Sequence, residues 1–341
     1  MRLLSRRTAL TSLVAAGGAL AAHRAFAKPR EFPLDPVRIE VEAREITHFQ
    51  PTAEAIRFGK LEFRGGLVLT SSNPGFGGIS GFALQRDGRR FLAVTDAGLL
   101  LDGELATDGD RPTGLANVRA CALKDDRGRP LALQGREDAE SLTLSPRGVF
   151  VGLETINEIW LYPADPMGQI GMRIDVPPGV KALRFNLGLE SLAYAAEGPL
   201  AGTLIAIGEE GASKSADLPG FLIGGPTPGT FTIAKSGPFN GTDACVGPDG
   251  VLYLLERHFS FSTGVLMQVR RFSMSDVKPG ARLSGEILFT ADMAYEIDNM
   301  EGLAVTRNAA GEIILTMISD DNFSPLQRTL LLRFAVVGEG R

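Results

Sequence analysis

The chain has 341 residues, of which 35 are basic and 40 acidic, with a formal net charge of −5 and two cysteines, Cys121 and Cys245. An acidic chain of this kind is not expected to bind nucleic acid through bulk charge, and two cysteines are too few for a disulfide-dense scaffold. One bridge between them is possible, but two free thiols are favoured because each lies in an apolar, strand-like run.

Residues 1–27 have the organisation of an export signal. A basic start is followed by an apolar stretch over 8–22 and by a small-x-small ending before Lys28. The pattern SRRxxL around Arg6–Arg7 is similar to a twin-arginine signal; an ordinary Sec signal and an uncleaved anchor are the alternatives. Because the apolar run is short for a membrane span, we expect a periplasmic or secreted, monomeric mature protein that does not contact a membrane.

Removal of residues 1–27 takes away four of the 35 basic residues and none of the 40 acidic ones, which leaves 31 against 40. The remaining chain, 28–341, is expected to be a single domain. It is rich in glycine (41) and proline (20), and short β-like runs alternate with turn residues. The first such runs, VRIEVEAREI and KLEFRGGLVL, lie within 36–70.

Five later segments repeat one pattern, in which a polar or acidic residue precedes a small residue, an apolar strand, a glycine-containing turn, a second apolar strand and an acid. The segments are 77–98, 138–156, 188–210, 242–259 and 299–323. The first key position holds Ser80, Glu140, Glu190, Asp243 and Glu301, at steps of 60, 50, 53 and 58 residues. The second key position holds Asp96, Glu154, Glu209, Glu256 and Asp320.

A repeat of about 50 residues made of short antiparallel strands is typical of a β-propeller blade. Five copies are visible, and residues 36–70 could supply a sixth blade that the C-terminal run TLLLRFAVV closes. We therefore predict an all-β, six-bladed propeller with four-stranded antiparallel blades; five and seven blades are the alternatives.

Hairpin geometry places both key positions of each blade at the same end of the propeller, so up to nine carboxylates would converge on one mouth of the central channel. Unit charges about 5 Å apart repel by a few kcal/mol at an effective dielectric constant near 20. Such carboxylates must be protonated, hydrogen-bonded, paired with bases or bound to a cation. Oxygen ligands without thiolate or imidazole favour Ca²⁺, with Mg²⁺ as the alternative. The competing interpretation is that these acids only bond to backbone amides and arginines.

Basic residues near this mouth are candidates for catalysis. Arg257 and His258 follow the second strand of the fourth repeat, and Arg328 lies in SDDNFSPLQRT. Guanidinium groups bind phosphate in a bidentate manner, so both arginines could hold a phosphoester beside a metal. Alternatively, the arginines are salt-bridge partners of the acids and the histidine is structural. The sequence contains neither HExxH nor G-x-S-x-G, so zinc-peptidase and serine-esterase signatures are absent.

Several of these segments resemble the phytase-like family, which is also described by esterase-like activity. They are GGISGFAL with FLAVTDAG, DAESLTL, LESLAY, LLERHFS, and DNMEGLAV followed by ISDDNFSPLQRTLLLRF. The resemblance spans roughly residues 60–335. It implies a secreted or periplasmic propeller with distant kinship to calcium-dependent propeller phytases. Two departures are Ser80 in place of an acid and ETINE at 154–158.

Two classes of function follow. The first is a calcium-dependent phosphoester hydrolase that acts on a small, phosphorylated molecule. In it, acids at the mouth hold the metal, and Arg257 and Arg328 hold the phosphate. The second is a non-catalytic propeller that binds a ligand or partner, with the turn-rich segment 211–230 as a lid or partner loop. A metal-dependent lactonase or esterase is a third, weaker possibility.

Overall fold

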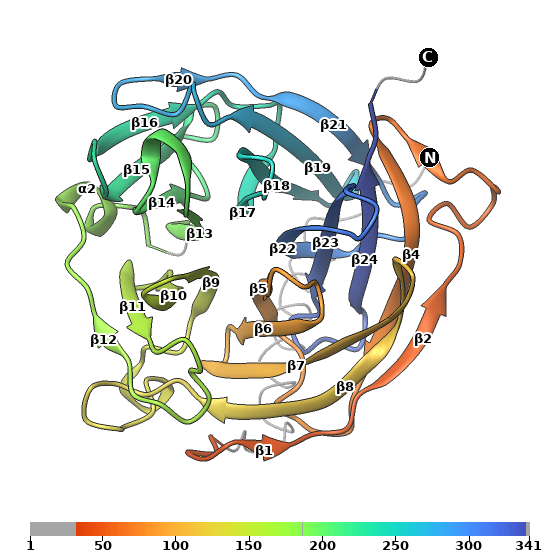
Figure 1. Cartoon of the computed structure of the whole chain (residues 1–341), viewed down its shortest axis with the longest axis horizontal. Helices are drawn as coiled ribbons and strands as arrows, with labels where there is room; N and C mark the ends of the chain where they lie inside the picture. Colours follow the sequence, from red (N-terminus) through yellow and green to blue (C-terminus); the bar gives the residue numbers. More distant parts are fainter. Residues whose placement is uncertain (1–31, 186, 339–341) are drawn as a thin grey trace, which may run out of the picture. The chain divides into compact units, whose positions relative to one another are not determined.

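Five β-sheets surround a common axis in the computed structural model (Figure 1). The structure describes residues 32–185 and 187–338, and residues from Phe32 onward form one compact unit. The expected export signal lies outside the described residues. Each sheet is a blade whose first strand is nearest the axis, and the five innermost strands contact one another in a closed circle. The described part of the chain is therefore a five-bladed propeller.

The first two blades are consecutive in the chain. Blade 1 runs outward from the axis through β5 (Ile79–Leu84), β6 (Arg90–Thr95), β7 (Leu99–Asp108), β8 (Arg111–Ala122) and β1 (Val37–Arg38). Blade 2 consists of β9 (Ala139–Ser145), β10 (Gly148–Leu153), β11 (Glu158–Tyr162) and β12 (Met172–Arg173). The helical turns are η1 (Ala132–Gln134), α2 (Pro178–Lys181) and η2 (Gly198–Leu200).

Blades 3 and 4 are linked by a strand that crosses between them. Blade 3 consists of β13 (Leu189–Ala195), β14 (Thr203–Gly208), β15 (Leu218–Gly224), β16 (Gly229–Ile233) and β20 (Arg282–Leu283). Blade 4 consists of β17 (Asn240–Val246), β18 (Val251–Ser260), β19 (Gly264–Ser273) and β21 (Glu286–Ala291). The short strand β20 leaves the chain of blade 4 and pairs in parallel with β16. Strands β15 and β16 include residues 218–224 and 229–230 of the segment 211–230, so part of that segment belongs to blade 3.

Blade 5 combines both ends of the described chain. Its strands, from the axis outward, are β22 (Asn299–Arg307), β23 (Ile313–Asp320), β24 (Thr329–Val336), β4 (Leu61–Thr70) and β2 (Glu42–Ile46), and β3 (Arg57–Phe58) pairs with β4. β4 and β24 pair antiparallel along their lengths. Hydrogen bonds between the first and last parts of the chain thus close the circle of blades.

The prediction of six blades was wrong for this reason. Residues 36–70 form strands, but none of these strands lies next to the axis, so they cannot begin a blade. Instead β1 extends blade 1, whereas β2 and β4 complete blade 5 (Figure 1). The C-terminal run that was expected to close a sixth blade forms the third strand of the fifth.

The apolar core is divided among the five interfaces between neighbouring blades. Each of five buried clusters draws its side chains mainly from two adjacent blades. In β5, for example, Phe82 packs towards blade 5 and the next residue, Ala83, packs towards blade 2. This alternation is the period-2 pattern of a strand buried on both faces.

Innermost strands of adjacent blades approach closely where the repeat has its small residue. A Cβ atom at Gly302 would lie 2.6 Å from the Cβ of Phe82, and one at Gly81 would lie 2.9 Å from the backbone nitrogen of Leu142. Real Cβ atoms do not approach other atoms so closely. Glycine at these two positions therefore permits the innermost strand of blade 1 to approach those of blades 5 and 2.

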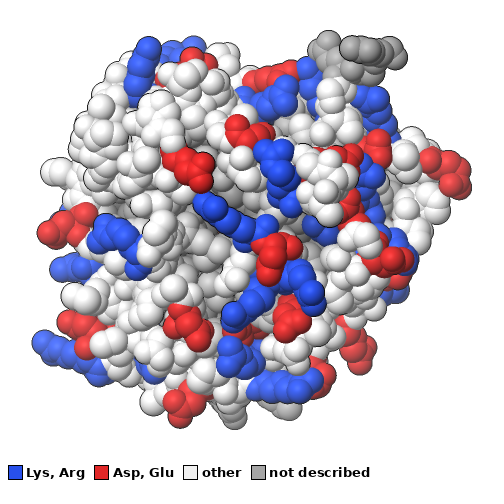
Figure 2. Space-filling model, viewed as in Figure 1, with Lys and Arg blue, Asp and Glu red and all other residues white. Residues whose placement is uncertain are grey.

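Both cysteines are free thiols, as the sequence favoured, and Cys121 is buried. Figure 2 shows basic and acidic side chains interspersed over the face that is viewed in Figure 1. Within residues 32–185 and 187–338, no helix has the length and apolar character needed to cross a membrane.

An aromatic cluster anchors the N-terminal segment between blades 4 and 5. Phe49 is fully buried, and its ring centroid lies between 4.9 and 5.9 Å from five other ring centroids. The partners are Phe58, Phe63, Phe289, Tyr295 and Phe334. The carbonyl of Phe49 also accepts a hydrogen bond from the amide of Glu296 at 2.7 Å.

We expect Phe49→Ala to lower the free energy of unfolding by about 3–5 kcal/mol, because the substitution leaves a cavity in a close-packed cluster. Urea denaturation would measure the loss. Ile56→Ala is the matched control, since Ile56 belongs to the same segment but is 56% exposed and should change stability by less than about 0.5 kcal/mol. Equal effects of the two substitutions would contradict the anchoring role of Phe49.

Candidate cation site at the mouth of the propeller

A β-bulge recurs at the same place in the innermost hairpin of every blade. The register shifts by one residue near the start of each innermost strand, so one residue of that strand lacks a partner of its own. The residues at these bulges are Ser80, Glu140, Glu190, Thr242 and Glu301. We call the end of the axis at which they lie the mouth.

A second set of equivalent residues stands at the mouth end of each second strand. The amide of Asp96 donates to the carbonyl of Gly78, and the amide of Glu154 donates in the same way to Asp138. The register of the other hairpins extends this equivalence to every blade. The set is Asp96, Glu154, Glu209, Arg257 and Asp320.

In the fourth blade, both key positions are one residue away from where the alignment of the five internal repeats placed them. Thr242, and not Asp243, is at the bulge, and the place of the second acid is taken by Arg257, not Glu256. The hydroxyl of Thr242 donates to the carbonyl of Met300 at 3.1 Å. Because the side-chain direction alternates along a strand, a slip of one residue reverses the face.

Asp243 consequently lies between blades 4 and 5. Its Oδ1 accepts a hydrogen bond from the amide of Ala244 at 2.8 Å, and its Oδ2 accepts one from the amide of Leu303 at 2.7 Å. Leu303 belongs to β22, the innermost strand of the next blade. Asp243 thus joins two blades instead of facing the mouth.

Glu256 is likewise occupied inside the fold. Its two carboxylate oxygens accept hydrogen bonds from Nε and Nη2 of Arg270, both at 2.6 Å. Arg270 also donates to the carbonyl of Ala234 at 2.9 Å, and both charged side chains are buried. This is a bidentate, buried ion pair, and its removal would leave an uncompensated charge.

The other seven predicted acids come together at the mouth, and we call them the acidic cluster. They are Asp96, Glu140, Glu154, Glu190, Glu209, Glu301 and Asp320. Glu190 interacts electrostatically with Glu140, Glu154, Glu209 and Glu301. The sequence thus located four of the five blades' contributions to the mouth correctly.

Three members of the acidic cluster are especially close. Glu154, Glu190 and Glu209 each offer a carboxylate oxygen, and these oxygens lie within 4.8 Å of one another. All three side chains are buried. Without a proton or a cation between these carboxylates, the arrangement would be strongly repulsive.

Burial and mutual repulsion raise the pKa values of this cluster. Burial raises the pKa of Glu154 to about 7, and nearby Asp138 and Glu209 add to the shift. The pKa of Glu301 is also raised to about 7 by burial, even though Arg257 opposes the shift. Burial, followed by neighbouring carboxylates, raises the pKa of Glu190 well above its usual value. At neutral pH the cluster therefore retains protons unless a cation replaces them.

Arg257 is the single cation at the ten equivalent positions of the mouth. Its Nη2 lies 3.2 Å from Oε1 of Glu301. Burial acts to lower the pKa of Arg257, but the carboxylates of Glu301, Glu190 and Glu209 outweigh it and raise the pKa. Arg257 was a candidate for phosphate binding from its sequence position, and the register shows why it reaches the mouth.

Several acids of the cluster also connect neighbouring blades. Oε1 of Glu154 accepts a hydrogen bond from the amide of Gly188 in the loop that enters blade 3, at 2.8 Å. Oε1 of Glu209 similarly accepts one from the side chain of Asn240 in blade 4, at 3.1 Å. Part of the interpretation that the acids close the circle therefore holds, but each of these bonds uses only one carboxylate oxygen.

Two acids next to the cluster, Asp138 and Asp321, were not among the site residues predicted from the sequence. Asp138 raises the pKa of Glu140 and Glu154, and it begins the quoted segment DAESLTL. Asp321 follows Asp320 directly, and its Oδ1 accepts a hydrogen bond from the amide of Gly78 in blade 1, at 2.9 Å. The signal in the sequence was the closeness of these acids to key positions: Asp138 is two residues before Glu140, and Asp321 follows Asp320.

The other two predicted catalytic residues lie outside the cluster. Nη1 of Arg328 binds Glu296 at 2.6 Å, and its Nη2 donates to the carbonyl of Ile297 at 3.1 Å. Its role is that of the salt-bridge partner considered as the alternative. His258 follows Arg257 in β18 and is partly buried, and its side chain points to the opposite face of the strand.

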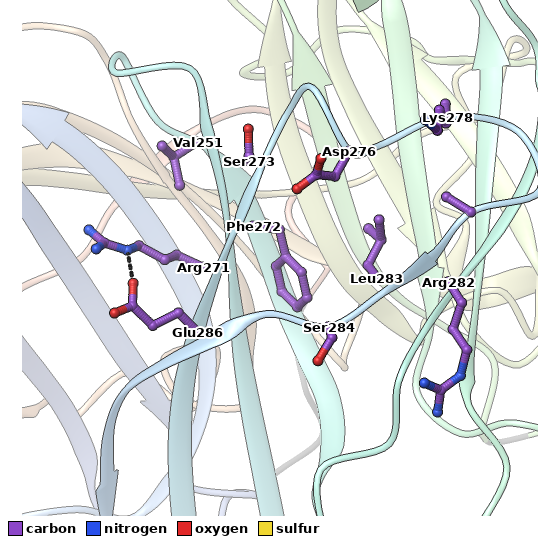
Figure 3. Close-up of a pocket in the computed structure, with 11 residues that line it drawn as sticks. Val251, Arg271, Phe272, Ser273, Asp276, Lys278, Arg282, Leu283, Ser284 and Glu286 are labelled. Carbon is purple, nitrogen blue, oxygen red and sulfur yellow. Dashed lines mark hydrogen bonds and ion pairs between the residues drawn. The ribbon is translucent and has the colours of Figure 1, made fainter.

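A pocket of about 680 Å³ lies at the other end of blade 4 (Figure 3). Its lining includes Val251, at the start of β18, and Ser273, at the end of β19. The arginines in its wall are already paired, Arg271 with Glu286 at 2.6 Å and Arg282 with Asp217 at 2.6 Å. The candidate site is therefore the acidic cluster and not this pocket.

Comparison with protein-family models matches residues 74–323 to a family described as "Phytase-like: Esterase-like activity of phytase". A search of curated proteins found no match. Among solved structures, the Cps50 (Swd1) β-propeller domain of Myceliophteria thermophila is 9% identical, with 88% of this chain and 100% of that chain covered and a TM-score of 0.39. The "putative oxidoreductase (glucose dehydrogenase)" of Thermus thermophilus is 13% identical, with 86% and 100% covered and a TM-score of 0.31. Neither structural likeness is close enough to inform function.

The raised pKa values predict an unusual pH dependence of stability. Folding shifts the pKa of Glu154 and Glu301 from 4.5 to about 7, so the folded state binds more protons than the unfolded state between these pH values. Stability in chelator should therefore fall as pH rises from about 4.5 to 7 and remain low above pH 7. Differential scanning fluorimetry would show a lower Tm at about pH 8 than at about pH 5.5.

Calcium provides the control for this pH dependence. Cation binding requires deprotonated carboxylates, so the increase in Tm that calcium causes should be larger at about pH 8 than at about pH 5.5. A Tm that rises steadily across this range in chelator would show that the cluster does not dominate the titration.

The register difference in blade 4 predicts opposite effects for two glutamates. Glu256→Gln breaks a buried ion pair and should lower the free energy of unfolding by about 3–5 kcal/mol. Glu190→Gln removes one of several buried carboxylates that repel each other, so it should not lower stability in chelator at about pH 8, but it should reduce stabilisation by calcium. Chemical denaturation with and without calcium would measure both. Equal destabilisation by the two substitutions would show that Glu190 is structural.

Proposed function

The chain belongs to the phytase-like family, and from this premise we propose that it hydrolyses phosphoesters with a divalent cation held by the acidic cluster. The observation that carries the proposal is the approach of Glu154, Glu190 and Glu209 oxygens to within 4.8 Å of one another, next to the partly buried Arg257. Carboxylates and an arginine together can bind a metal and a phosphate group.

The donor set fits a hard cation. Every candidate ligand in the acidic cluster is a carboxylate oxygen, which suits Ca²⁺ or Mg²⁺ better than Zn²⁺. Calcium is preferred because it accepts about six to eight oxygens in irregular geometry, whereas magnesium requires a near-octahedral arrangement. Glu154, Glu190 and Glu209 would hold the ion, and Glu140 would lie beside it. When bound, such a cation supplies positive charge that stabilises the oxygens of a phosphoester.

Blade 4 differs chemically from the other blades at the mouth. Blades 2 and 3 contribute Glu154, Glu190 and Glu209, whereas blade 4 contributes Arg257. A phosphate group between them would have carboxylate-bound cation on one side and guanidinium donors on the other. Arg257 would orient the phosphate oxygens through charge-assisted hydrogen bonds.

Glu301 is the group that we assign to proton transfer. Burial raises its pKa to about 7, so it can both accept and release a proton near neutral pH. Its Oε1 contacts Arg257 and the side-chain amide of Asn299, which fixes the carboxyl group and leaves Oε2 for the transfer. The acid would thus deliver its proton beside the residue that holds the phosphate.

The test is hydrolysis of p-nitrophenyl phosphate by the purified chain with calcium and with EGTA. We expect activity with calcium, loss of at least about 100-fold in EGTA, and recovery when calcium is restored. Arg257→Met should lower kcat/KM by about 10- to 100-fold, as expected for loss of a hydrogen bond between charged groups. Arg328→Met is the matched control, because that arginine lies outside the cluster, and it should change kcat/KM by less than about threefold.

Two results would overturn the proposal. Full activity in EGTA, confirmed by elemental analysis to be free of metal, would exclude the cation. Absence of turnover for every phosphomonoester with calcium present would exclude phosphoester hydrolysis. A carboxyl ester and a lactone belong in the same panel, because the family description names esterase-like activity.

A further inference from the structure

Two exposed phenylalanines stand beyond Arg257 on the hairpin of β18 and β19. Phe259 is 54% exposed and Phe261 is fully exposed, and their ring centroids are 5.6 Å apart in an edge-to-face arrangement. Two neighbouring exposed aromatic rings close to a candidate site form apolar surface that a ligand can contact.

Strand geometry shows which way Phe259 faces. β18 pairs with β19 without a bulge from Val251 to Ser260, so residues two apart share one face of the strand. Leu255, Arg257 and Phe259 are therefore on the same face. Leu255 packs into the apolar cluster between blades 4 and 5, and Arg257 contacts Glu301 of blade 5. Phe259 thus follows Arg257 on the strand face that contacts Glu301, on the side away from Leu255.

A third exposed apolar residue lies beside the tip of the same hairpin. Met293, in the connection from blade 4 to blade 5, is 56% exposed, and a Cβ atom at Gly264 would lie 2.9 Å from its Cγ. Gly264 pairs with Ser260, whereas Phe259 pairs with Val265, so Met293 is on the other face of the hairpin from Phe259. We call Phe259 and Phe261 the apolar wall.

The negative charge at the mouth limits the number of phosphate groups that a ligand can carry. The acidic cluster has seven carboxylates. Arg257 interacts with Glu301, Glu190 and Glu209, and Lys235 interacts with Glu209. The guanidinium of Arg257 can hold one phosphate group through charge-assisted hydrogen bonds. An inositol polyphosphate would bring several further phosphates towards the remaining carboxylates, where like charges repel.

On the basis of the proposed function, we propose that the substrate is a monoester of one phosphate group with an alkyl or aryl alcohol. The phosphate lies at Arg257, and the apolar part of the alcohol packs against the apolar wall. In the reaction, water forms a new P–O bond, the P–O bond to the alcohol breaks, and one proton of the water ends on the alcohol oxygen. The products are inorganic phosphate and the free alcohol.

The test compares ethyl, butyl and hexyl phosphate, which have leaving groups of similar reactivity, with phytate. The protein is the chain from Lys28, since every strand of the described residues lies in the compact unit that begins at Phe32. Because each methylene that leaves water favours binding, KM should fall about tenfold from ethyl to hexyl phosphate. The double substitution Phe259→Ser with Phe261→Ser should raise KM for hexyl phosphate to that for ethyl phosphate.

Met172→Ser is the control, because Met172 is 67% exposed but lies at the outer edge of blade 2, and it should leave the chain-length dependence unchanged. Equal KM values for the three alkyl phosphates, or a higher kcat/KM for phytate, would overturn the inference while hydrolysis itself remained. If no phosphoester is hydrolysed, the proposed function fails, and calorimetric binding of the same alkyl phosphates then decides the inference. Tighter binding of hexyl phosphate that is lost in the double variant would support it, and equal binding would refute it.

Discussion

The close approach of five innermost strands around one axis is the constraint on which the rest of the molecule depends. A Cβ atom at Gly302 would lie 2.6 Å from Cβ of Phe82 in the next blade, so no side chain fits there. The residues that follow the five bulges are Gly81, Ser141, Ser191, Asp243 and Gly302, four of which are small. Once the circle is closed, the bulges before these residues bring their own side chains to one mouth. Seven carboxylates are thereby forced into a small, largely buried volume, where protons or a cation must compensate their charge.

Structural and chemical roles are combined in the same carboxylates. Glu154 and Glu209 each use Oε1 to hold the following blade, which fixes the position of the second oxygen. Preorganisation of this kind is what a metal or transition-state site requires, because the groups do not have to reorganise when charge arrives. By contrast, Asp243 uses both oxygens on backbone amides and Glu256 uses both on Arg270. These two acids resemble the others in sequence but have no oxygen left for a ligand.

The sequence predicted the propeller class because the repeat of about 50 residues and its turns are local signals. It could not predict the number of blades, because β4 is assigned to blade 5 by pairing with β24, at the opposite end of the chain. It also misaligned the fourth repeat. The string TDACV has a polar residue before a small one, as ESL does, and the bulge that places Thr242 at the mouth leaves no mark in the sequence. That Arg257 occupies the position of the second acid follows from the same register and could not be predicted from the repeat.

Arg257, which stands in the fourth blade where the other blades have an acid, makes the mouth asymmetric. Five identical blades would present a symmetric collection of acids, suited to a cation but repulsive to an anionic ligand. In the proposed function, the presence of Arg257 in place of an acid lets the same mouth bind a cation at Glu154, Glu190 and Glu209 and an anionic group at Arg257. The same strand then continues into exposed Phe259, so charge recognition and apolar contact come from one rigid hairpin. β17 pairs with β18 from Leu252 to Arg257, and β19 pairs with it from Val251 to Ser260. The distance between Arg257 and Phe259 is therefore fixed by strand pairing and not by a flexible loop.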